Sequence, residues 1–318
     1  MKQVTIILLL VTLTNILFSS ESYRMAFGSC LHQNYPAPIW NAIEEQKINS
    51  FYFLGDNVYG DTPSGIPWKL KSSYELQRQA LPKWLGNSEI FSIWDDHDYG
   101  KNDAGGTYEY KQKAQSLYLD FWNIPIEDQR HQRDGIYFSE IKVINGSRIL
   151  FIGLDTRYFR SDIKKSKGVY LQNTSADATI LGQEQWKWLE ETLDQDFDFL
   201  VIATSIQVLA TEHRFEKWNN IPKDRSKLIN LLKNLPERSL IISGDRHRGG
   251  IYKLDNLIEV TSSSLNRGSS YQSETDALLI GNTYSQNNYG LLTFNENSVL
   301  VELFDQDNNS LESISISF

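Results

Sequence analysis

The chain has 318 residues, of which 12% are aromatic, with 40 acidic against 31 basic side chains, a formal net charge of −9 and one cysteine. This length and aromatic content exclude a disordered chain and allow a large buried core. The negative charge disfavours attraction to nucleic acids and anionic membranes, so an anionic substrate would have to be held by local cations. A single cysteine excludes an internal disulfide framework.

Residues 1–20 resemble a secretory signal. Lys2 precedes an apolar stretch at residues 6–18, and two small residues, Ser19 and Ser20, follow it. The stretch is too short to span a bilayer. We therefore expect an exported protein, periplasmic or secreted, with no transmembrane span and one domain over residues 21–318. A buried first helix is the alternative interpretation of this segment.

Beyond the signal, residue patterns alternate between strands and helices. Short apolar runs indicate buried strands, and apolar residues at helical spacing indicate helices. Asn145 and Gly146 form a strong hairpin signal. The predicted strands are residues 23–29, 50–54, 89–94, 135–144, 148–154, 197–204, 239–243, 251–254, 257–262, 290–294, 298–304 and 310–316, and the predicted helices are residues 38–46, 68–85 with a break at Pro82, 110–122, 182–193 and 224–235.

This order predicts an α/β fold in which two packed mixed β-sheets are flanked by helices. The strands near the C-terminus follow one another without helices, which indicates an added antiparallel region. A polar stretch at residues 262–288, rich in Ser, Asn and Gly, is too long for a plain connection. We expect it to form a loop that covers the functional site, and disorder is the alternative.

Four motifs with polar or nucleophilic residues follow apolar runs. Because the carboxyl ends of parallel strands meet at one edge of a sheet, these motifs should converge on one crevice. Their carboxylates, imidazoles, tyrosine, asparagine and cysteine predict a site for more than one metal ion. The motifs are Phe-Gly-Ser-Cys at 27–30, Gly-Asp-Asn-Val-Tyr-Gly-Asp at 55–61, Trp-Asp-Asp-His-Asp-Tyr-Gly-Lys-Asn-Asp at 94–103 and Gly-Asp-Arg-His at 244–247.

The ligand types indicate a mixed-metal centre. Carboxylates suit hard ions such as Ca²⁺, Mg²⁺ or Mn²⁺, whereas thiolate and phenolate favour Fe³⁺ or Zn²⁺. Asp56 and Tyr59 are three residues apart, so a turn after the strand could point both into one coordination sphere. For each motif alone, the alternative is an ordinary turn or a packed side chain, and for Cys30 an inert core thiol.

The run at residues 95–98 contains four consecutive ionisable side chains, which would be costly to bury unless they are paired or bound to metal. His97 is flanked by carboxylates, so its pKa should be raised and it can serve as a general acid. Asn102 offers an amide oxygen that could complete a hard metal sphere. A solvated acidic loop is the alternative.

Other candidates occur later in the chain. Asp245 and His247 are two residues apart and share a face of an extended segment, so both could bind metal. Arg157 follows another apolar strand and could clamp phosphate oxygens bidentately; the alternative is a structural ion pair with Asp155. His213 is a second candidate for the catalytic acid, or else a polar residue satisfied by its surroundings.

Together these motifs resemble the PhoD-like alkaline phosphatase D family within the calcineurin-like metallophosphoesterase superfamily. The chain departs from the wider superfamily at Cys30, Tyr59, Asp96 and Asp245, and these departures are typical of the PhoD-like branch. The resemblance runs from residue 26 to about 264 and rests on the four motifs with Leu-Asp-Thr-Arg at 154–157 and Glu-Lys-Trp at 216–218.

The resemblance implies a metallophosphoesterase-type four-layer αββα sandwich and a centre of Fe³⁺ and Ca²⁺. It implies hydrolysis of small phosphate mono- and diesters at alkaline pH through a metal-bound oxygen nucleophile. Either Asp95 or Asp96 would be the ligand in the acidic run. The implied metal ligands are Asp56 as the bridge, Cys30 and Tyr59 with His247 for iron, and Asp96, Asn102 and Asp245 for calcium.

Two other functions are compatible with the same residues. One is a phosphodiesterase selective for phospholipids or wall polymers, whose selectivity would lie in the loops. The other is a calcium-binding module without catalysis. Intact His97, His247 and Cys30 argue against the second function.

Overall fold

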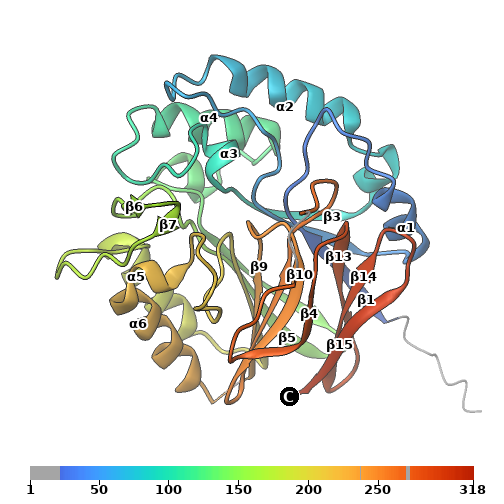
Figure 1. The fold of residues 1–318 in the computed structure, drawn as a ribbon. Coiled ribbons are helices and arrows are strands. Elements are labelled where there is room, and N and C mark those ends of the chain that lie inside the picture. Colours follow the sequence, from blue (N-terminus) through green and yellow to red (C-terminus); the bar gives the residue numbers. More distant parts are fainter. Residues whose placement is uncertain (1–21, 237, 270–272) are drawn as a thin grey trace, which may run out of the picture.

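The computed structural model describes residues 22–236, 238–269 and 273–318, and the predicted signal at residues 1–20 lies outside them. Two mixed β-sheets pack against each other, with helices on the outside (Figure 1). The predicted α/β fold class is therefore confirmed. Among the described residues, none of the helices combines the length and apolar character needed to cross a membrane.

The first sheet has six strands in the order β15-β14-β13-β1-β2-β3. Strands β1, β2 and β3 run parallel, and the C-terminal strands extend the sheet in antiparallel fashion. The parallel strands therefore end at the same edge. The bounds are β1 Tyr23–Gly28, β2 Ser50–Leu54, β3 Glu89–Ile93, β13 Asn288–Phe294, β14 Ser298–Asp305 and β15 Ser310–Ser317.

The second sheet has seven strands in the order β12-β10-β11-β9-β8-β5-β4. Its centre, β5, β8, β9 and β11, is parallel, and β4, β10 and β12 are antiparallel additions. The bounds are β4 Phe138–Ile144, β5 Ser147–Gly153, β8 Phe199–Thr204, β9 Arg238–Ser243, β10 Gly249–Leu254, β11 Leu257–Ser262 and β12 Leu279–Tyr284, with a separate small hairpin of β6 Lys165–Ser166 and β7 Val169–Tyr170.

Helices cover both outer faces of the paired sheets. Helix α1 packs on the first sheet, and α5 and α6 pack on the second, which gives the four layers αββα. Helices α2, α3 and α4 lie together over one end of the sheets (Figure 1). The bounds are α1 Ile39–Glu45, α2 Trp68–Ala80, α3 Asp96–Tyr99, α4 Lys111–Phe121, α5 Gly182–Leu193 and α6 Pro222–Lys233, with 3₁₀ turns η1 Lys83–Asn87, η2 Gln129–His131 and η3 Trp218–Asn220.

The central strands are apolar on both faces because both faces are covered. In β2, Tyr52 and Leu54 belong to the core between the sheets, whereas Phe51 and Phe53 pack with α1. Alternate side chains of a strand point to opposite faces, so an unbroken apolar run suits a strand buried on both sides. This packing fixes β2 and the turn that follows it.

The polar stretch at residues 262–288 is only partly the predicted loop. Its second half forms β12, which sequence patterning missed, and β12 pairs with β10. Its first half contributes Arg267, Gly268 and Ser269 to the wall of a cavity at the sheet edge. These three residues therefore lie at the cavity, and the predicted role of this half as a loop that covers the site stays a prediction.

Candidate metal centre

The four sequence motifs converge at the carboxyl ends of the parallel strands. Cys30 follows β1, Asp56 follows β2 and Asp95 follows β3, all in the first sheet. Asp245 follows β9 of the second sheet. A cavity of about 400 Å³ opens there. Its wall includes Asp56, Asp96, His97, Asn102, Asp103, Asp245 and His247.

The backbone at these positions is unusual for the residue types that occupy it. Cys30, Asp56, Asp245 and His247 have φ angles of 58°, 51°, 65° and 53°, in the left-handed region. This region is unfavourable for residues other than glycine, and such strain persists mainly where the surrounding structure imposes it, often at functional sites. The strand ends therefore hold four candidate ligands in conformations that the chain would not adopt by itself.

Small residues let the strand ends approach one another. A Cβ atom added to Gly55, which has a φ of 98°, would lie 2.6 Å from Cβ of Asp95. A Cβ atom added to Gly244 would lie 2.6 Å from Oγ of Ser29. The glycine of each Gly-Asp motif is therefore needed for close packing around the cavity.

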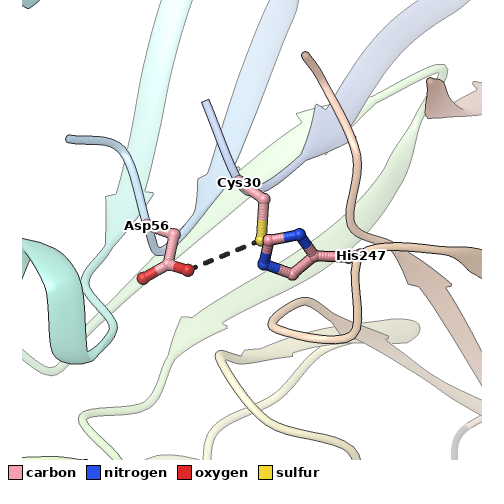
Figure 2. Close-up of side chains that lie close together, drawn as sticks. All are labelled: Cys30, Asp56 and His247. Atoms are coloured by element: carbon pink, nitrogen blue, oxygen red, sulfur yellow. Dashed lines mark hydrogen bonds between the residues drawn. The ribbon is translucent and has the colours of Figure 1, made fainter. Parts of the chain in front are cut away.

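Asp56 is common to three groups of potential metal ligands. In each group the ligand atoms lie within 4.8 Å of one another. Figure 2 shows the first group, in which Sγ of Cys30 lies 3.5 Å from Oδ2 of Asp56 and the ring of His247 faces both. The Tyr59 hydroxyl donates to the same oxygen at 3.1 Å. The three groups are Cys30 with Asp56 and His247, Asp56 with Asp96 and His97, and Asp56 with Asp95 and Asp245.

Burial makes this concentration of negative charge unfavourable without cations. Desolvation, with the charges of nearby carboxylates, raises the pKa of Asp56 and Asp245 well above the usual range. Burial likewise raises the pKa of the Cys30 thiol and of the Tyr59 phenol. Bound cations would stabilise the ionised form of all four groups. The donor set and its electrostatics therefore fit a metal centre.

The structure gives the two neighbouring aspartates different environments. Oδ1 of Asp95 accepts from Arg157 at 2.5 Å and from the Ser205 hydroxyl at 2.6 Å. Its other oxygen, Oδ2, is buried without a hydrogen-bond partner among the described residues. Asp96 accepts from the backbone N–H of Asp103 at 2.6 Å. Asp95 and Asp96 thus each contribute an oxygen to a group of potential ligands around Asp56.

His97 is held by a carboxylate that sequence reasoning did not single out. Its Nδ1 lies 2.7 Å from Oδ1 of Asp61, and its backbone N–H donates to Asp56 at 3.3 Å. Burial opposes the charged imidazole, but Asp56, Asp96 and Asp61 together raise the pKa of His97 to about 11. The raised pKa agrees with the sequence prediction. Asp61 stands two residues after Tyr59 in the second motif, and this position could have identified it as a site residue from the sequence.

The model of a family described as PhoD-like phosphatase matches residues 73–309. The chain belongs to the PhoD-like phosphatase family. This family and the ligand groups together indicate a metal-dependent phosphoesterase, and the predicted family resemblance is confirmed. None of the curated proteins matches the chain in sequence.

Solved structures share the fold of this PhoD-like chain at low identity, which supports the fold alone. The structure of PhoD has a TM-score of 0.71 at 16% identity, covering 93% of this chain and 70% of that one. GAP50, described as the anchor in the inner membrane complex of Plasmodium, has a TM-score of 0.64 at 13% identity, and the match covers 93% of this chain and 89% of GAP50. Purple acid phosphatase PPD1 from yellow lupin has a TM-score of 0.62 at 14% identity, and the match covers 94% of this chain and 54% of PPD1.

The PhoD-like chain places Asn102 at the exposed mouth of the cavity. Its Nδ2 donates to Oδ2 of Asp103 at 2.6 Å, and it lies outside the three ligand groups. Asp103 also pairs with Lys165 and Tyr170 of the β6–β7 hairpin. The structure therefore brings Asn102 to the site, but its predicted role as a calcium ligand stays a prediction.

Arg157 lies behind the cavity and does not line it. The side chain is fully buried, with ion pairs to Asp95 at 2.5 Å and Glu216 at 2.9 Å. Glu216 also pairs with Arg160 at 3.0 Å. The predicted phosphate clamp is therefore not supported by the geometry. The alternative of a structural ion pair describes Arg157 better, with Asp95 and Glu216 as partners in place of Asp155.

His213 is likewise removed from the wall of the cavity. Its Nδ1 accepts the backbone N–H of Phe215 at 3.2 Å, and its Nε2 is buried without a hydrogen-bond partner among the described residues. Burial and the nearby cations Arg246 and Lys217 lower its pKa well below the usual range. A neutral imidazole behind the wall is a poor general acid, so the geometry favours His97 over His213.

Arg267 is a site residue that sequence reasoning missed. Its guanidinium lies 4.2 Å from the ring centroid of Tyr59, and it lines the cavity. It is the one basic residue between positions 262 and 288, and this feature could have identified it from the sequence. Arg267 thus provides one of the local cations that an anionic substrate of this acidic chain requires.

Proposed function

We propose that the protein is an exported hydrolase of phosphate mono- and diesters, active at alkaline pH, with an iron and calcium centre organised by Asp56. The observation that carries this proposal is the membership of Asp56 in all three ligand groups. A carboxylate with two oxygens can contact more than one ion, so we assign the bridging role to Asp56. Export rests on the sequence of residues 1–20.

The donor types support the choice of metals. The thiol of Cys30, the phenol of Tyr59 and the imidazole of His247 suit a Lewis-acidic transition metal such as Fe³⁺. The carboxylates of Asp96 and Asp245 suit Ca²⁺. Bound metals would supply Lewis acidity, an activated oxygen nucleophile and neutralisation of the phosphoryl charge.

Residues of the chain would orient the ester and donate a proton to its leaving group. Asp61 binds Nδ1 of His97, which leaves Nε2 to donate a proton to the leaving-group oxygen. Arg267 adds positive charge beside Tyr59, where it can bind a phosphoryl oxygen. Charge at these atoms would be most effective in a buried site, because a low dielectric strengthens each interaction.

Metal analysis combined with two assays tests the proposal. We expect iron and calcium in the purified full-length protein and release of nitrophenol from both 4-nitrophenyl phosphate and bis(4-nitrophenyl) phosphate, faster at pH 9 than at pH 7. Zinc as the only metal would overturn the assignment of metals. Failure of the metal-replete protein to cleave either ester would overturn the activity.

Cys30→Ser tests the assignment of iron. Replacing the thiol should lower iron occupancy selectively, because oxygen of serine is a weaker ligand for this metal than thiolate. Ser263→Ala is the matched control, since the Ser263 hydroxyl lies 3.2 Å from the same sulfur and is not a proposed ligand. Elemental analysis should show less iron with unchanged calcium only in Cys30→Ser. Normal iron in that variant would make Cys30 a core residue.

A further inference from the structure

Part of the cavity wall is basic and takes no part in the proposed metal centre. Arg246 and Arg248 line the same cavity as the ligand residues, together with Phe215. Both arginine side chains are almost fully buried, at 4% and 2% exposure. Buried guanidinium groups on the wall of a cavity need an explanation, because burying a charge is costly unless it is paired.

The pairing of Arg246 is incomplete. Its Nη2 donates to Glu274, and its guanidinium lies 4.3 Å from the ring centroid of Phe215. Its Nε is buried without a hydrogen-bond partner among the described residues. A residue that lines the cavity thus carries a buried, unsatisfied N–H donor and only part of the pairing that its charge requires.

One carboxylate serves two arginines. Glu274, which pairs with Arg246, also lies 3.6 Å from Nε of Arg248. Nη1 of Arg248 donates to the neutral Thr283 hydroxyl at 3.0 Å. Arg246 and Arg248 therefore share the carboxylate of Glu274.

A third basic side chain, Lys217, lies near Arg246. Nζ of Lys217 donates to the backbone carbonyl groups of His213 and Phe215, which are neutral. Burial and the charge of Arg246 lower the pKa of Lys217 to about 8.

We propose that Arg246 and Arg248 form a second anion subsite, so that the preferred substrate is a phosphate ester that carries another phosphate or a carboxylate. This inference rests on the proposed function, since the reacting phosphate would lie at the metal centre. The planar guanidinium group matches both anions by bidentate hydrogen bonds. A cavity of about 400 Å³ accommodates an organic ligand larger than a single phosphate group.

Three substrates with the same reacting end test the subsite. They are propane-1,3-diyl bisphosphate, 4-phosphooxybutanoate and 3-hydroxypropyl phosphate, whose second ends are a phosphate, a carboxylate and a neutral hydroxyl. The wild-type protein should show a higher kcat/KM for at least one anionic second end than for the neutral one, beyond the twofold advantage of two reactive ends in the bisphosphate. The preferred anion identifies the chemical source. Equal values for all three would overturn the proposal.

Arg246→Gln should lower the ratio of kcat/KM for the preferred anionic substrate to that for the neutral one by about tenfold to 100-fold, the range for lost charged hydrogen bonds. The ratio compares substrates on one preparation, so loss of folding or metal cancels. Arg214→Gln is the matched control, because Arg214 lies 5.2 Å from the centroid of the same Phe215 ring and is exposed. Its ratio should not change. An unchanged ratio in Arg246→Gln would overturn the proposal.

A binding measurement separates this inference from the proposed activity. If the metal-replete protein cleaves none of the three esters, the proposed function fails, and calorimetry with propane-1,3-bisphosphonate and propylphosphonate then tests the subsite. We expect tighter binding of the bisphosphonate, with the difference lost in Arg246→Gln and kept in Arg214→Gln. Equal affinity of the wild-type protein for both ligands would overturn the subsite.

Discussion

Two neighbouring groups of buried carboxylates share Asp95 and differ in their cations. In the first group, Asp95 and Glu216 are paired with Arg157 and Arg160 at 2.5–3.0 Å. In the second group, Asp56 and Asp245 line the cavity beside Asp95, and the described residues contain no ion pair between either of them and a lysine or arginine. Asp96 differs, because despite its burial the charges of His97, Arg157 and Arg160 lower its pKa to about 2. Arginines therefore balance the buried carboxylates of the first group, whereas Asp56 and Asp245 in the second group have no such partner among the described residues.

This difference separates a structural role from a binding role. A buried carboxylate with an arginine partner is stable as it stands, although breaking the pair is costly. A group of buried carboxylates without partners is stable only when protonated or bound to cations. The charge balance of each group, rather than the number of carboxylates, indicates where metal binds.

The largest effect is expected from Asp56→Ala. No other residue belongs to all three ligand groups, so its loss should remove metal and abolish turnover. Elemental analysis and the nitrophenyl phosphate assay measure both. The exposed Asp177→Ala is the control and should keep full metal and activity. Retained metal and substantial activity in Asp56→Ala would reduce Asp56 to a turn residue.

Arg157→Met should destabilise the protein by about 3–5 kcal/mol, because it leaves Asp95 and Glu216 buried without their partner. Urea denaturation of the metal-replete protein measures the change. Arg130→Met is the comparison, since Arg130 pairs at 2.7 Å with the more exposed Asp128 and should cost less. A stable Arg157→Met protein with impaired turnover would restore the phosphate clamp predicted from the sequence.

His97→Ala should affect substrates unequally. Esters with poor alkoxide leaving groups should slow by roughly 10² or more, the usual contribution of a general acid. Activated aryl esters should be spared, since their leaving groups depart without protonation. The ratio of the two rates on one preparation measures the effect, and misfolding cannot imitate it. An equal loss on both substrates would make His97 a residue that orients the metal ligands.

Local patterns allowed much of the fold and the ligand set to be predicted. Residues 50–54 read as a strand because both faces of β2 are buried, and the Gly-Asp motifs stand directly after β2 and β9. Strand β12 was missed because Gly281 and Asn282 interrupt its apolar pattern and its pairing comes from the distant β10. The partners of Arg157 could not be predicted from local sequence patterns either, since Asp95 and Glu216 are 62 and 59 residues away in the chain.

The smallest effect concerns stability against pH in the metal-free protein. Burial raises the pKa of Asp98 to about 8, and the carboxylates around His97 raise its pKa to about 11 despite burial. Between pH 6.5 and 8 the folded state therefore keeps protons that the unfolded chain has released, so stability falls as pH rises. Each such proton contributes about 1.4 kcal/mol per pH unit.

Bound cations favour the ionised carboxylate and disfavour the charged imidazole, so the metal-replete protein should depend less on pH. Circular dichroism at rising temperature should show the Tm of the chelated protein falling by several degrees from pH 6.5 to pH 8, given about 2–4 °C per kcal/mol in proteins of 150–250 residues. Asp98→Asn should weaken this fall, because it removes one of the titrating groups. A Tm of the chelated protein that stays constant or rises would show that the carboxylates around Asp56 are already balanced without metal, and the contrast with the Arg157 group would then be lost.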